Sequence, residues 1–419
     1  MPSFPTLRTE IAGIPVADLA RRFGTPVFVY DAAMMRRRLG DLRRFDHVRY
    51  AQKACSNLAV LSLLRREGAL VDAVSAMEIR RALAAGYRAE GEVPPIVYTA
   101  DIFDADSLEL VVERNIHVNC GSPDMIDQYG AVASGREITL RINPGFGHGH
   151  SQKTNTGGPQ SKHGIWHEQL PACLAAAERR ALGVTGLHMH IGSGTDMEHL
   201  AQICGAMEKA ALTAGGSIRS VSVGGGLPVA YREHDATVDL DAYFELCDAM
   251  RKRIEDGLGQ KVSLEVEPGR YLVAESGYLV AEIRAVKRQA DNLFYLVDAG
   301  FNNLPRPILY GAYHPISIAP ADGQTDRPEV DAIIGGPLCE SGDIFTQEEG
   351  GFVARRRLPQ TAIGDLLVLE RAGAYAAVMG SNYNSKPMAP EVLIDGGEPR
   401  LVRRRQTFEE LTVGESIPE

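Results

Sequence analysis

Four short strings of this chain carry groups whose chemistries complement one another. Lys53 offers a primary amine, His190 a flat imidazole ring, and Gly224 to Gly226 a run of unhindered backbone N–H groups. The fourth string, Glu267-Pro268-Gly269-Arg270, supplies a carboxylate and a guanidinium. Each string lies at the C-terminal end of an expected buried strand, and catalytic groups at that end of several strands are typical of a (β/α)8 barrel. Together the strings could hold a phosphorylated ring compound.

Lys53 lies next to Ala54 in an apolar run that we expect to be a strand from Val48 to Ala54. Burial of an ammonium group costs free energy, so an amine in this position should have a lowered pKa. Such an amine forms Schiff bases readily. The alternative is a lysine at the end of the strand whose amine reaches water or a carboxylate.

Phosphate binding is the role that the glycine run suggests, because backbone N–H groups at the upper face of a barrel can wrap an anion. Ser193, which ends the turn His190-Ile191-Gly192-Ser193, adds a hydroxyl of the kind that contacts phosphates. In a chain with 43 glycines, Gly224-Gly225-Gly226 could also be a turn that arose by chance. His190 could stack on an aromatic cofactor or be a hydrogen-bonded histidine of the core.

The last string stands at the exit of the eighth expected strand. Pro268 stiffens that exit, and Gly269 lets the chain pass close to a ligand. Glu267 could pair with a ring nitrogen while Arg270 reaches an anion, although an internal ion pair between the two would also explain them. A metal site is not favoured, because the loop near the clustered histidines offers no cysteine or carboxylate in metal-ligand spacing. The histidines are His148, His150, His163 and His167.

Eight short runs rich in Val, Ile and Leu alternate with stretches of helical periodicity. The runs are Val48 to Ala54, Val71 to Ser75, Ile96 to Ala100, Ile116 to Cys120, Ile138 to Asn143, Val184 to His190, Val221 to Gly224 and Val262 to Val266. The helical stretches include Leu58 to Arg66, Ala76 to Ala85, Asp106 to Arg114, Leu170 to Leu182, His199 to Ala214 and Leu240 to Asp256. The alternation predicts an α/β fold, a (β/α)8 TIM-type barrel over residues 31–271, with a doubly wound open sheet as the alternative.

After Arg270 the pattern changes to strands broken by Gly, Pro and Asp turns. The expected strands are Tyr278 to Lys287, Leu293 to Val297, Val330 to Ile334, Leu366 to Leu369 and Glu391 to Ile394. We therefore expect a C-terminal all-β domain, a β-barrel or sandwich, made of residues 272–419 and residues 1–30, to which Val27 to Tyr30 gives a strand. The segment Phe146 to His163 is a long loop of the kind that is usually functional or mobile.

The composition narrows the possible partners. The net charge is −10, and no basic stripe is interleaved with aromatics in the way that nucleic-acid surfaces require. No apolar run approaches the length of a membrane span, and Arg8 and Glu10 interrupt the start where a secretory segment would be apolar. Six scattered cysteines without a Cys-x-x-Cys pair indicate free thiols. We expect a soluble cytoplasmic protein with neither membrane nor nucleic-acid partners.

The ordered motifs resemble those of the fold-type III pyridoxal-phosphate-dependent decarboxylases, and within them the diaminopimelate decarboxylases. The likeness covers nearly the whole chain. It rests on Gly24-Thr25-Pro26, Tyr50 to Ala54, His188 to Ser193, Gly224 to Gly226, Glu267 to Arg270, Asp298 to Gly300, Arg306 to Tyr310, Gly336 to Asp343 and Gly373 to Tyr375. Two departures, Ala54-Cys55 for the frequent Ala-Asn and Lys162-His163-Gly164 for Lys-Phe-Gly, leave the catalytic groups in place.

The resemblance implies pyridoxal 5'-phosphate as the cofactor, bonded through its aldehyde to Lys53. His190 would pack against the cofactor ring, and Glu267 would keep the pyridine nitrogen protonated so that the ring can accept electrons from the substrate. The phosphate end would be held by Ser193, Gly224, Gly225, Gly226, Arg270 and Tyr375, with Gly269 also at the cofactor.

The resemblance also implies a substrate site and a homodimer. The substrate would be bound by Arg270, Arg306, Tyr310, Glu340 and Tyr375. Cys339 would donate the proton that replaces the lost carboxylate, which makes it catalytic together with Lys53 and His190. In this family Cys339 and Glu340 enter the site from the partner subunit.

Arg306 favours a substrate with a distal carboxylate, since its guanidinium can bind a carboxylate through two hydrogen bonds while Glu340 takes an ammonium group. The expected reaction is decarboxylation of meso-2,6-diaminopimelate at its D-configured centre to L-lysine and CO2, the last step of lysine biosynthesis. Decarboxylation of D-lysine, D-ornithine or another basic amino acid is the alternative. A non-catalytic pyridoxal-phosphate homeostasis protein would resemble only the barrel, and an alanine-racemase-like enzyme would need a catalytic tyrosine in place of the Cys339 motif.

Overall fold

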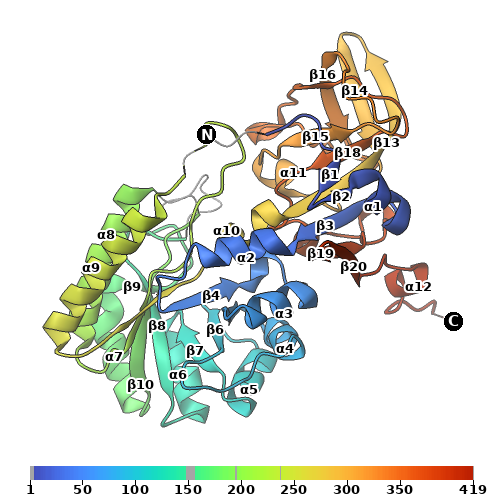
Figure 1. The fold of residues 1–419 in the computed structure, drawn as a ribbon. Helices are drawn as coiled ribbons and strands as arrows, with labels where there is room; N and C mark the ends of the chain where they lie inside the picture. The colour runs from blue at the N-terminus through green and yellow to red at the C-terminus, as the bar shows by residue number, and fades with distance from the viewer. Residues whose placement is uncertain (1–3, 148–155, 194–195, 236, 419) are drawn as a thin grey trace. The chain divides into compact units, whose positions relative to one another are not determined.

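The computed structural model describes residues 4–147, 156–193, 196–235 and 237–418 (Figure 1). The chain forms two compact units. The β unit combines residues 1–35, 230–235 and 273–419, and the barrel unit combines residues 36–229 and 236–272. The expected domain limits of residues 31–271 stay a prediction; the compact units divide after residues 35 and 272, and residues 230–235 belong to the β unit.

Within its described residues, the barrel unit closes eight parallel strands into a ring. They are β4 (His47–Ala51), β5 (Leu70–Ala73), β6 (Ile96–Ala100), β7 (His117–Cys120), β8 (Glu137–Asn143), β10 (Gly183–His188), β11 (Ser220–Ser222) and β12 (Ser263–Val266). The strands pair in chain order, β8 pairs with β10, and β12 returns to β4. A short strand, β9 (Ile165–Trp166), lies beside β8. The predicted barrel is confirmed, and the open sheet is wrong.

Helices separate these strands. They are α3 (Leu58–Arg66), α4 (Ala76–Ala84), α5 (Ala105–Glu113), α6 (Pro123–Val132), α7 (Leu170–Arg179), α8 (Met197–Ala214) and α9 (Leu240–Leu258), with α2 (Ala32–Gly40) before β4. Most begin where a side-chain oxygen accepts a backbone N–H of the first turn. These caps are Asn57, Ser75, Asp104, Ser122, Asp196 and Asp239. In the described part of the chain, no helix combines the length and apolar character needed to cross a membrane.

The β unit is built on one twisted sheet with the strand order β17-β16-β14-β13-β3-β19-β20, and β18 joins β13 to β15. Its strands are β3 (Val27–Asp31), β13 (Gly277–Gln289), β14 (Asn292–Val297), β15 (Ile316–Ala319), β16 (Glu329–Gly335), β17 (Arg356–Pro359), β18 (Leu366–Leu369), β19 (Glu391–Asp395) and β20 (Glu398–Arg403). The predicted N-terminal strand is confirmed, since β3 pairs with both β13 and β19. The strands β15, β17 and β20 were not predicted.

Short elements complete the fold. They are β1 (Glu10–Ile11), β2 (Ile14–Pro15), α1 (Val16–Phe23), α10 (Arg270–Val273), α11 (Arg306–Tyr310) and α12 (Phe408–Leu411). Ile11, Val16 and Leu19 from the first of these elements are buried in one apolar core with Val27 and Val280 from the sheet. The N-terminal segment is therefore part of the β unit's core.

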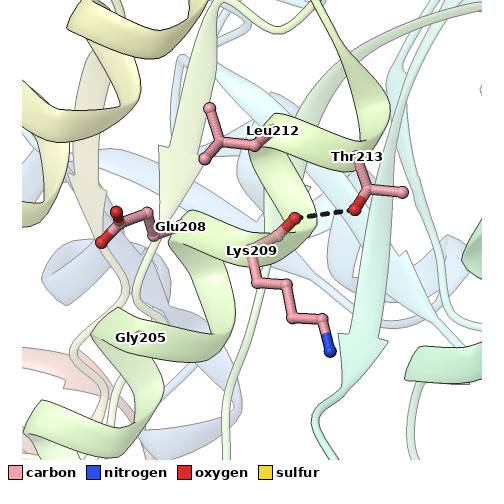
Figure 2. A pocket seen from close by; sticks show the side chains of 5 residues that line it. All are labelled: Gly205, Glu208, Lys209, Leu212 and Thr213. Atoms are coloured by element: carbon pink, nitrogen blue, oxygen red, sulfur yellow. Dashed lines mark hydrogen bonds between the residues drawn. The ribbon is translucent and has the colours of Figure 1, made fainter.

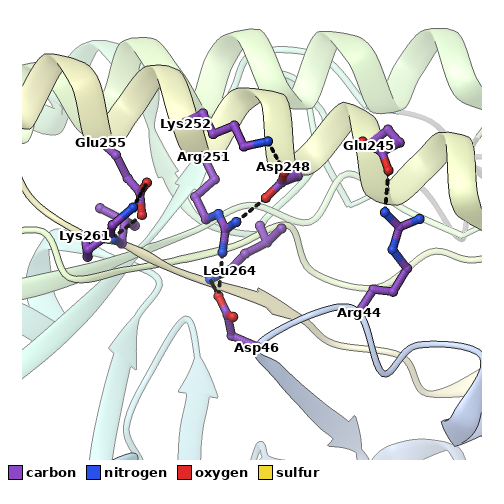
Figure 3. Close-up of polar contacts among 10 residues, drawn as sticks. Arg44, Asp46, Glu245, Asp248, Arg251, Lys252, Glu255, Lys261 and Leu264 are labelled. Carbon is purple, nitrogen blue, oxygen red and sulfur yellow. Dashed lines mark hydrogen bonds and ion pairs between the residues drawn. The ribbon is translucent and has the colours of Figure 1, made fainter.

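The barrel closes where β4 meets β12 and α9. The Asp46 carboxylate accepts the backbone N–H of Leu264 at 2.8 Å and pairs with Arg251 at 3.2 Å (Figure 3). Next to it, the buried Phe45 ring packs against Tyr243 and Phe244 of α9, with centroid distances of 5.7 and 5.3 Å. The first strand is thus held to the last strand and the last helix by one aromatic cluster and one carboxylate.

We expect Phe45→Ala to destabilise the barrel unit by about 3 kcal/mol, because the substitution removes a buried ring and leaves a cavity. Phe408→Ala is the control, since Phe408 is 71% exposed in α12 and its loss should change stability by less than about 0.5 kcal/mol. Urea unfolding followed through Trp166, the one tryptophan and a residue of the barrel unit, measures both changes. Equal effects of the two substitutions would contradict this account of closure.

Candidate active site

The ends of neighbouring strands remain hydrogen-bonded beyond the barrel wall. The Glu267 N–H donates to the Gly224 carbonyl at 2.7 Å, which joins the segments that follow β12 and β11. The Ala51 N–H donates to the Pro268 carbonyl at 3.1 Å, which joins β4 to the same segment. Since β10 lies next to β11, all four predicted strings of the barrel follow adjacent strands at one end of the barrel unit.

The glycine run is required for the close packing of these segments. Gly224 has a φ of +68°, and a Cβ on it would lie 2.5 Å from the Met189 carbonyl oxygen and 2.7 Å from the Cβ of His190. A Cβ on Gly225 would lie 2.4 Å from the Glu267 carbonyl oxygen. A turn formed by chance would not demand glycine in this way. The run fixes where His190 and Glu267 stand.

Lys53 is exposed, so the expected burial of its amine is wrong. The pairing of β4 with β5 ends at Ala51, and the next residues form a 3-10 turn, η1 (Gln52–Ala54), that leaves the barrel wall. The turn buries Gln52 and Ala54 and leaves Lys53 in solvent at the barrel end. Its charge acts on the site: burial lowers the pKa of His190 most, and the Lys53 ammonium lowers that pKa further.

Glu267 is a buried carboxylate held by a histidine that was not predicted. His188 Nε2 lies 2.8 Å from Glu267 Oε2, and both side chains are buried. Burial alone would raise the pKa of Glu267, but the charge and hydrogen bond of His188, followed by the charges of Arg49 and Arg141, outweigh it and lower the pKa. Glu267 is therefore ionised at neutral pH. The repeat His188-Met189-His190 in the sequence was the available signal, since residues two apart share a face of a strand.

Asp72, the third residue of β5, is a second buried carboxyl group with the opposite behaviour. Burial raises its pKa well above the ordinary value, and the charge of Glu267 raises it further, against the hydrogen bond from Thr99 and the charge of Lys53. Its Oδ1 has no hydrogen-bond partner among the described residues. The surroundings thus push the pKa values of the two carboxyl groups apart, that of Asp72 upward and that of Glu267 downward. Asp72 lies inside a predicted strand, but it was given no role.

His190 follows β10 as a half-buried, neutral imidazole. Burial, and then the charges of Lys53 and Arg141, hold its pKa well below the usual range. Its Nδ1 is buried without a hydrogen-bond partner in the described part of the chain, which fits poorly with a hydrogen-bonded core histidine. Ser193, three residues further on, lies half-buried in a bend.

His163 is engaged by a carboxylate. Its Nδ1 lies 2.6 Å from Asp101 Oδ2, and the other oxygen of Asp101 accepts the Gly164 N–H at 2.8 Å. Burial raises the pKa of Asp101, but the hydrogen bonds from His163 and Gly164 outweigh it and lower the pKa. No three His, Cys, Asp or Glu side chains of the described residues are grouped to bind a metal ion, and His148 and His150 lie outside those residues.

Two of the predicted substrate residues lie on α11 of the β unit. Arg306 is buried at its start, and Tyr310 is half-buried at its end. Arg306 Nη1 lies 2.9 Å from His314 Nε2, and its guanidinium lies over the Tyr231 ring, 4.9 Å from the ring centroid. Neither His314 nor Tyr231 was predicted. Tyr231 belongs to the short segment of residues 230–235 that joins the β unit.

Cys339 and Glu340 are exposed on a tight turn of the β unit. The buried Asp343 shapes this turn, because its carboxylate accepts the Leu338 N–H at 2.8 Å. Tyr375 has a φ of +56°, a conformation that costs a bulky residue about 1 kcal/mol or more and that is enriched at functional sites. The predicted residues of this unit therefore stand on a fixed turn and a strained backbone position.

A surface depression elsewhere on the barrel unit is not the site. It is lined by Gly205, Glu208, Lys209, Leu212 and Thr213, all from α8 (Figure 2). Its polar groups are engaged locally: Thr213 donates to the Lys209 carbonyl at 2.8 Å, and Glu208 pairs with Arg253 at 2.7 Å. None of the predicted site residues lines it.

The residues at the barrel end suit pyridoxal phosphate. The Lys53 amine is exposed outside the barrel wall, and the ionised Glu267 carboxylate is buried. His190 Nδ1 and Asp72 Oδ1 have no hydrogen-bond partner among the described residues. At Gly224 and Gly225 the neighbouring segments pack so closely that there is no space for a side chain. The fold and these groups define a barrel enzyme of the pyridoxal-phosphate class.

Comparisons with known proteins agree with this class. Residues 32–274 match the pyridoxal binding domain of the pyridoxal-dependent decarboxylases. The diaminopimelate decarboxylase of Streptomyces coelicolor is 54% identical over 99% of this chain and 94% of its own length, and that of Escherichia coli K12 is 53% identical over 96% of each. A crystal structure of a diaminopimelate decarboxylase, 54% identical, matches with a TM-score of 0.92 over 94% of both chains. The crystal structure of diaminopimelate decarboxylase from Helicobacter pylori complexed with L-lysine is 30% identical and has a TM-score of 0.83. The match covers 95% of this chain and 98% of the Helicobacter pylori chain.

The chain belongs to the pyridoxal-dependent decarboxylase family, and within it to the diaminopimelate decarboxylases. Its cofactor is pyridoxal phosphate. The predicted family and cofactor are confirmed, and the roles of the individual site residues stay predictions.

We expect Gly224→Ala to weaken pyridoxal phosphate binding by about tenfold or more, because the new Cβ displaces the Met189–His190 segment. Gly215→Ala is the matched control: Gly215 also has a positive φ, +84°, but nothing lies within 4 Å of the point that a Cβ on it would occupy. Titration of each cofactor-free variant with pyridoxal phosphate, followed by absorbance, measures the change. If both variants bind the cofactor as tightly as the parent, the packing argument is wrong.

Proposed function

We propose that the chain decarboxylates meso-2,6-diaminopimelate to L-lysine and CO2. The observation that carries the proposal is the buried Arg306, an oriented cation suited to a substrate that ends in a carboxylate. Support also comes from relatives that are 53–54% identical over nearly the whole chain and are named diaminopimelate decarboxylases. The cytoplasm remains the expected location.

Bound pyridoxal phosphate supplies an aldehyde that condenses with amines and a ring that withdraws electrons from the reacting carbon. Lys53 offers the amine that holds the aldehyde. Ionised Glu267 would accept a hydrogen bond from a protonated ring nitrogen and so favour the electron-poor form of the ring. Neutral His190 offers a flat face without adding a second positive charge. The phosphate would be bound by Ser193, Gly224 to Gly226, Arg270 and Tyr375.

The distal end of the substrate requires an anion site and a cation site. Arg306 binds the distal carboxylate, and Glu340 binds the ammonium group beside it. Tyr310 and Tyr375 complete the substrate site, and Cys339 returns a proton to the carbon that loses CO2. Since Cys339 and Glu340 are exposed on the turn shaped by Asp343, we propose that each chain gives them to the site of a partner copy in a homodimer.

Other basic amino acids are the alternative substrates. D-lysine and D-ornithine share the reacting centre but lack the distal carboxylate, so they would bring no anion to the Arg306 cation. The loss of a charge-assisted contact to a buried group costs a few kcal/mol, or roughly a hundredfold or more in specificity. A homeostasis protein or a racemase is disfavoured by the second unit, which carries Arg306 and Cys339.

The substrate is tested by measuring CO2 release from meso-diaminopimelate, D-lysine, D-ornithine, L-lysine, L-ornithine and L-arginine with the holoenzyme. We expect kcat/KM for meso-diaminopimelate to exceed that for every other compound by roughly a hundredfold or more. Preference for any diamino monocarboxylate would refute the assignment.

Lys53→Ala should abolish the visible absorbance of lysine-bound cofactor and lower turnover by several orders of magnitude, because the nucleophilic amine is lost. Lys209→Ala, which removes another lysine of the barrel unit from α8, should leave both unchanged. Absorbance spectra and single-turnover assays provide the measurement. Retained absorbance in the first variant would mean that a different lysine carries the cofactor.

A further inference from the structure

The orientation of Arg306 depends on contacts within the β unit. The side chain is buried, and a buried guanidinium needs hydrogen-bond acceptors. His314 Nε2, 2.9 Å from Arg306 Nη1, is such an acceptor, and the Tyr231 ring covers one face of the guanidinium. Neither contact brings a negative charge. These two contacts therefore help to orient the guanidinium.

The protonation of His314 follows from its two neighbours. His314 Nδ1 lies 3.0 Å from the Glu370 carbonyl oxygen, which can only accept a hydrogen bond. Nδ1 must then carry the proton, and Nε2 must offer a lone pair, because the Arg306 guanidinium can only donate. A neutral imidazole with one defined tautomer satisfies both contacts. The ring is 2% exposed, so water does not compete for either nitrogen.

The support behind His314 is itself fixed. The Glu370 carboxylate is bound by the Arg8 guanidinium at 2.7 and 3.0 Å and accepts the Ser317 hydroxyl at 2.8 Å. The Glu370 N–H donates to the Pro315 carbonyl at 2.9 Å, next to His314 in the chain. The Tyr231 ring also meets the His314 ring edge-on, with centroids 5.3 Å apart. The imidazole has little freedom to turn.

We propose that His314 is a positioning residue that aims the Arg306 guanidinium at the distal carboxylate of the substrate and thereby sets specificity for a substrate with two amino-acid ends. The inference rests on the proposed function. His314 does not touch the substrate; it acts through Arg306, with Tyr231 as the second support. Its effect should therefore fall on substrate and product affinity rather than on the chemical step.

Two substitutions separate the hydrogen bonds of His314. Asparagine can place an amide donor near the Nδ1 position, which keeps the bond to the Glu370 carbonyl and loses the acceptor for Arg306. Glutamine can place an oxygen near the Nε2 position, which keeps the acceptor for Arg306 and loses the other bond. Each variant loses one hydrogen bond, so the two are matched for a purely structural effect.

The experiment measures kcat and KM for meso-diaminopimelate, and the inhibition constant of L-lysine, with holoenzyme of the parent, His314→Asn and His314→Gln. L-lysine retains the carboxylate of the untouched centre, so its binding also reports on Arg306. We expect His314→Asn to raise KM and the inhibition constant in parallel by about tenfold or more, with kcat within about threefold of the parent. His314→Gln should restore both constants to within about threefold of the parent.

Equal effects of the two variants on KM, or a fall in kcat with unchanged KM, would overturn the positioning role. A parent enzyme that releases no CO2 from meso-diaminopimelate would instead overturn the proposed function, so the two failures are distinguishable. Thermal unfolding and the absorbance of bound cofactor identify a variant that fails to fold. In that case Tyr231→Leu replaces it, and a rise in KM without a change in kcat is again the expected result.

Discussion

The barrel end depends on two buried carboxyl groups whose pKa values the surroundings push in opposite directions. Burial raises the pKa of both Glu267 and Asp72, because the charged form of each loses its hydration. His188 reverses the effect for Glu267 through a 2.8 Å hydrogen bond, whereas the charge on Glu267 adds to the effect on Asp72. Before any ligand binds, the surroundings therefore favour the charged form of Glu267 and the protonated form of Asp72. Under the proposed function, Glu267 would supply the negative charge that the nitrogen of an electron-withdrawing cofactor ring needs.

The backbone places these charges with little freedom. Gly224 and Gly225 let the segments after β10, β11 and β12 approach so closely that a single Cβ would force them apart. In the β unit the buried charge is the Arg306 guanidinium. His314 contacts it through a hydrogen bond and Tyr231 through the face of its ring, and these contacts orient it. In both units a histidine that is not expected to touch the substrate acts on a charged residue. His188 lowers the pKa of Glu267, and His314 orients the Arg306 guanidinium.

Much of the barrel was predictable because its strands are buried on both faces and so appear as apolar runs. Strand ends were less predictable: the run Val48 to Ala54 continues past Ala51, where pairing stops and the chain turns, and this error led to the wrong burial of Lys53. The strands β17 and β20 lie at the two edges of the β unit's sheet, where one side is unpaired and charged residues replace the apolar pattern.

The missed site residues share one cause. His188 acts on a partner 79 positions away, so the local repeat His188-Met189-His190 marks the residue but not its partner. His314 links Arg306 to a carbonyl 56 positions away, and no local pattern marks that role. The predicted residues were recognised through motifs, which name the groups that meet a ligand but not the side chains behind them. Asp72 was missed because its raised pKa depends on burial and on the nearby charge of Glu267, which is distant in the sequence.

The division of charge between the two acids is tested most directly by infrared spectroscopy of the cofactor-free protein at neutral pH, comparing the parent with Asp72→Asn and Glu267→Gln. The account predicts a band of a protonated carboxylic acid that disappears in the Asp72 variant and persists in the Glu267 variant. Loss of that band in the Glu267 variant alone would contradict it.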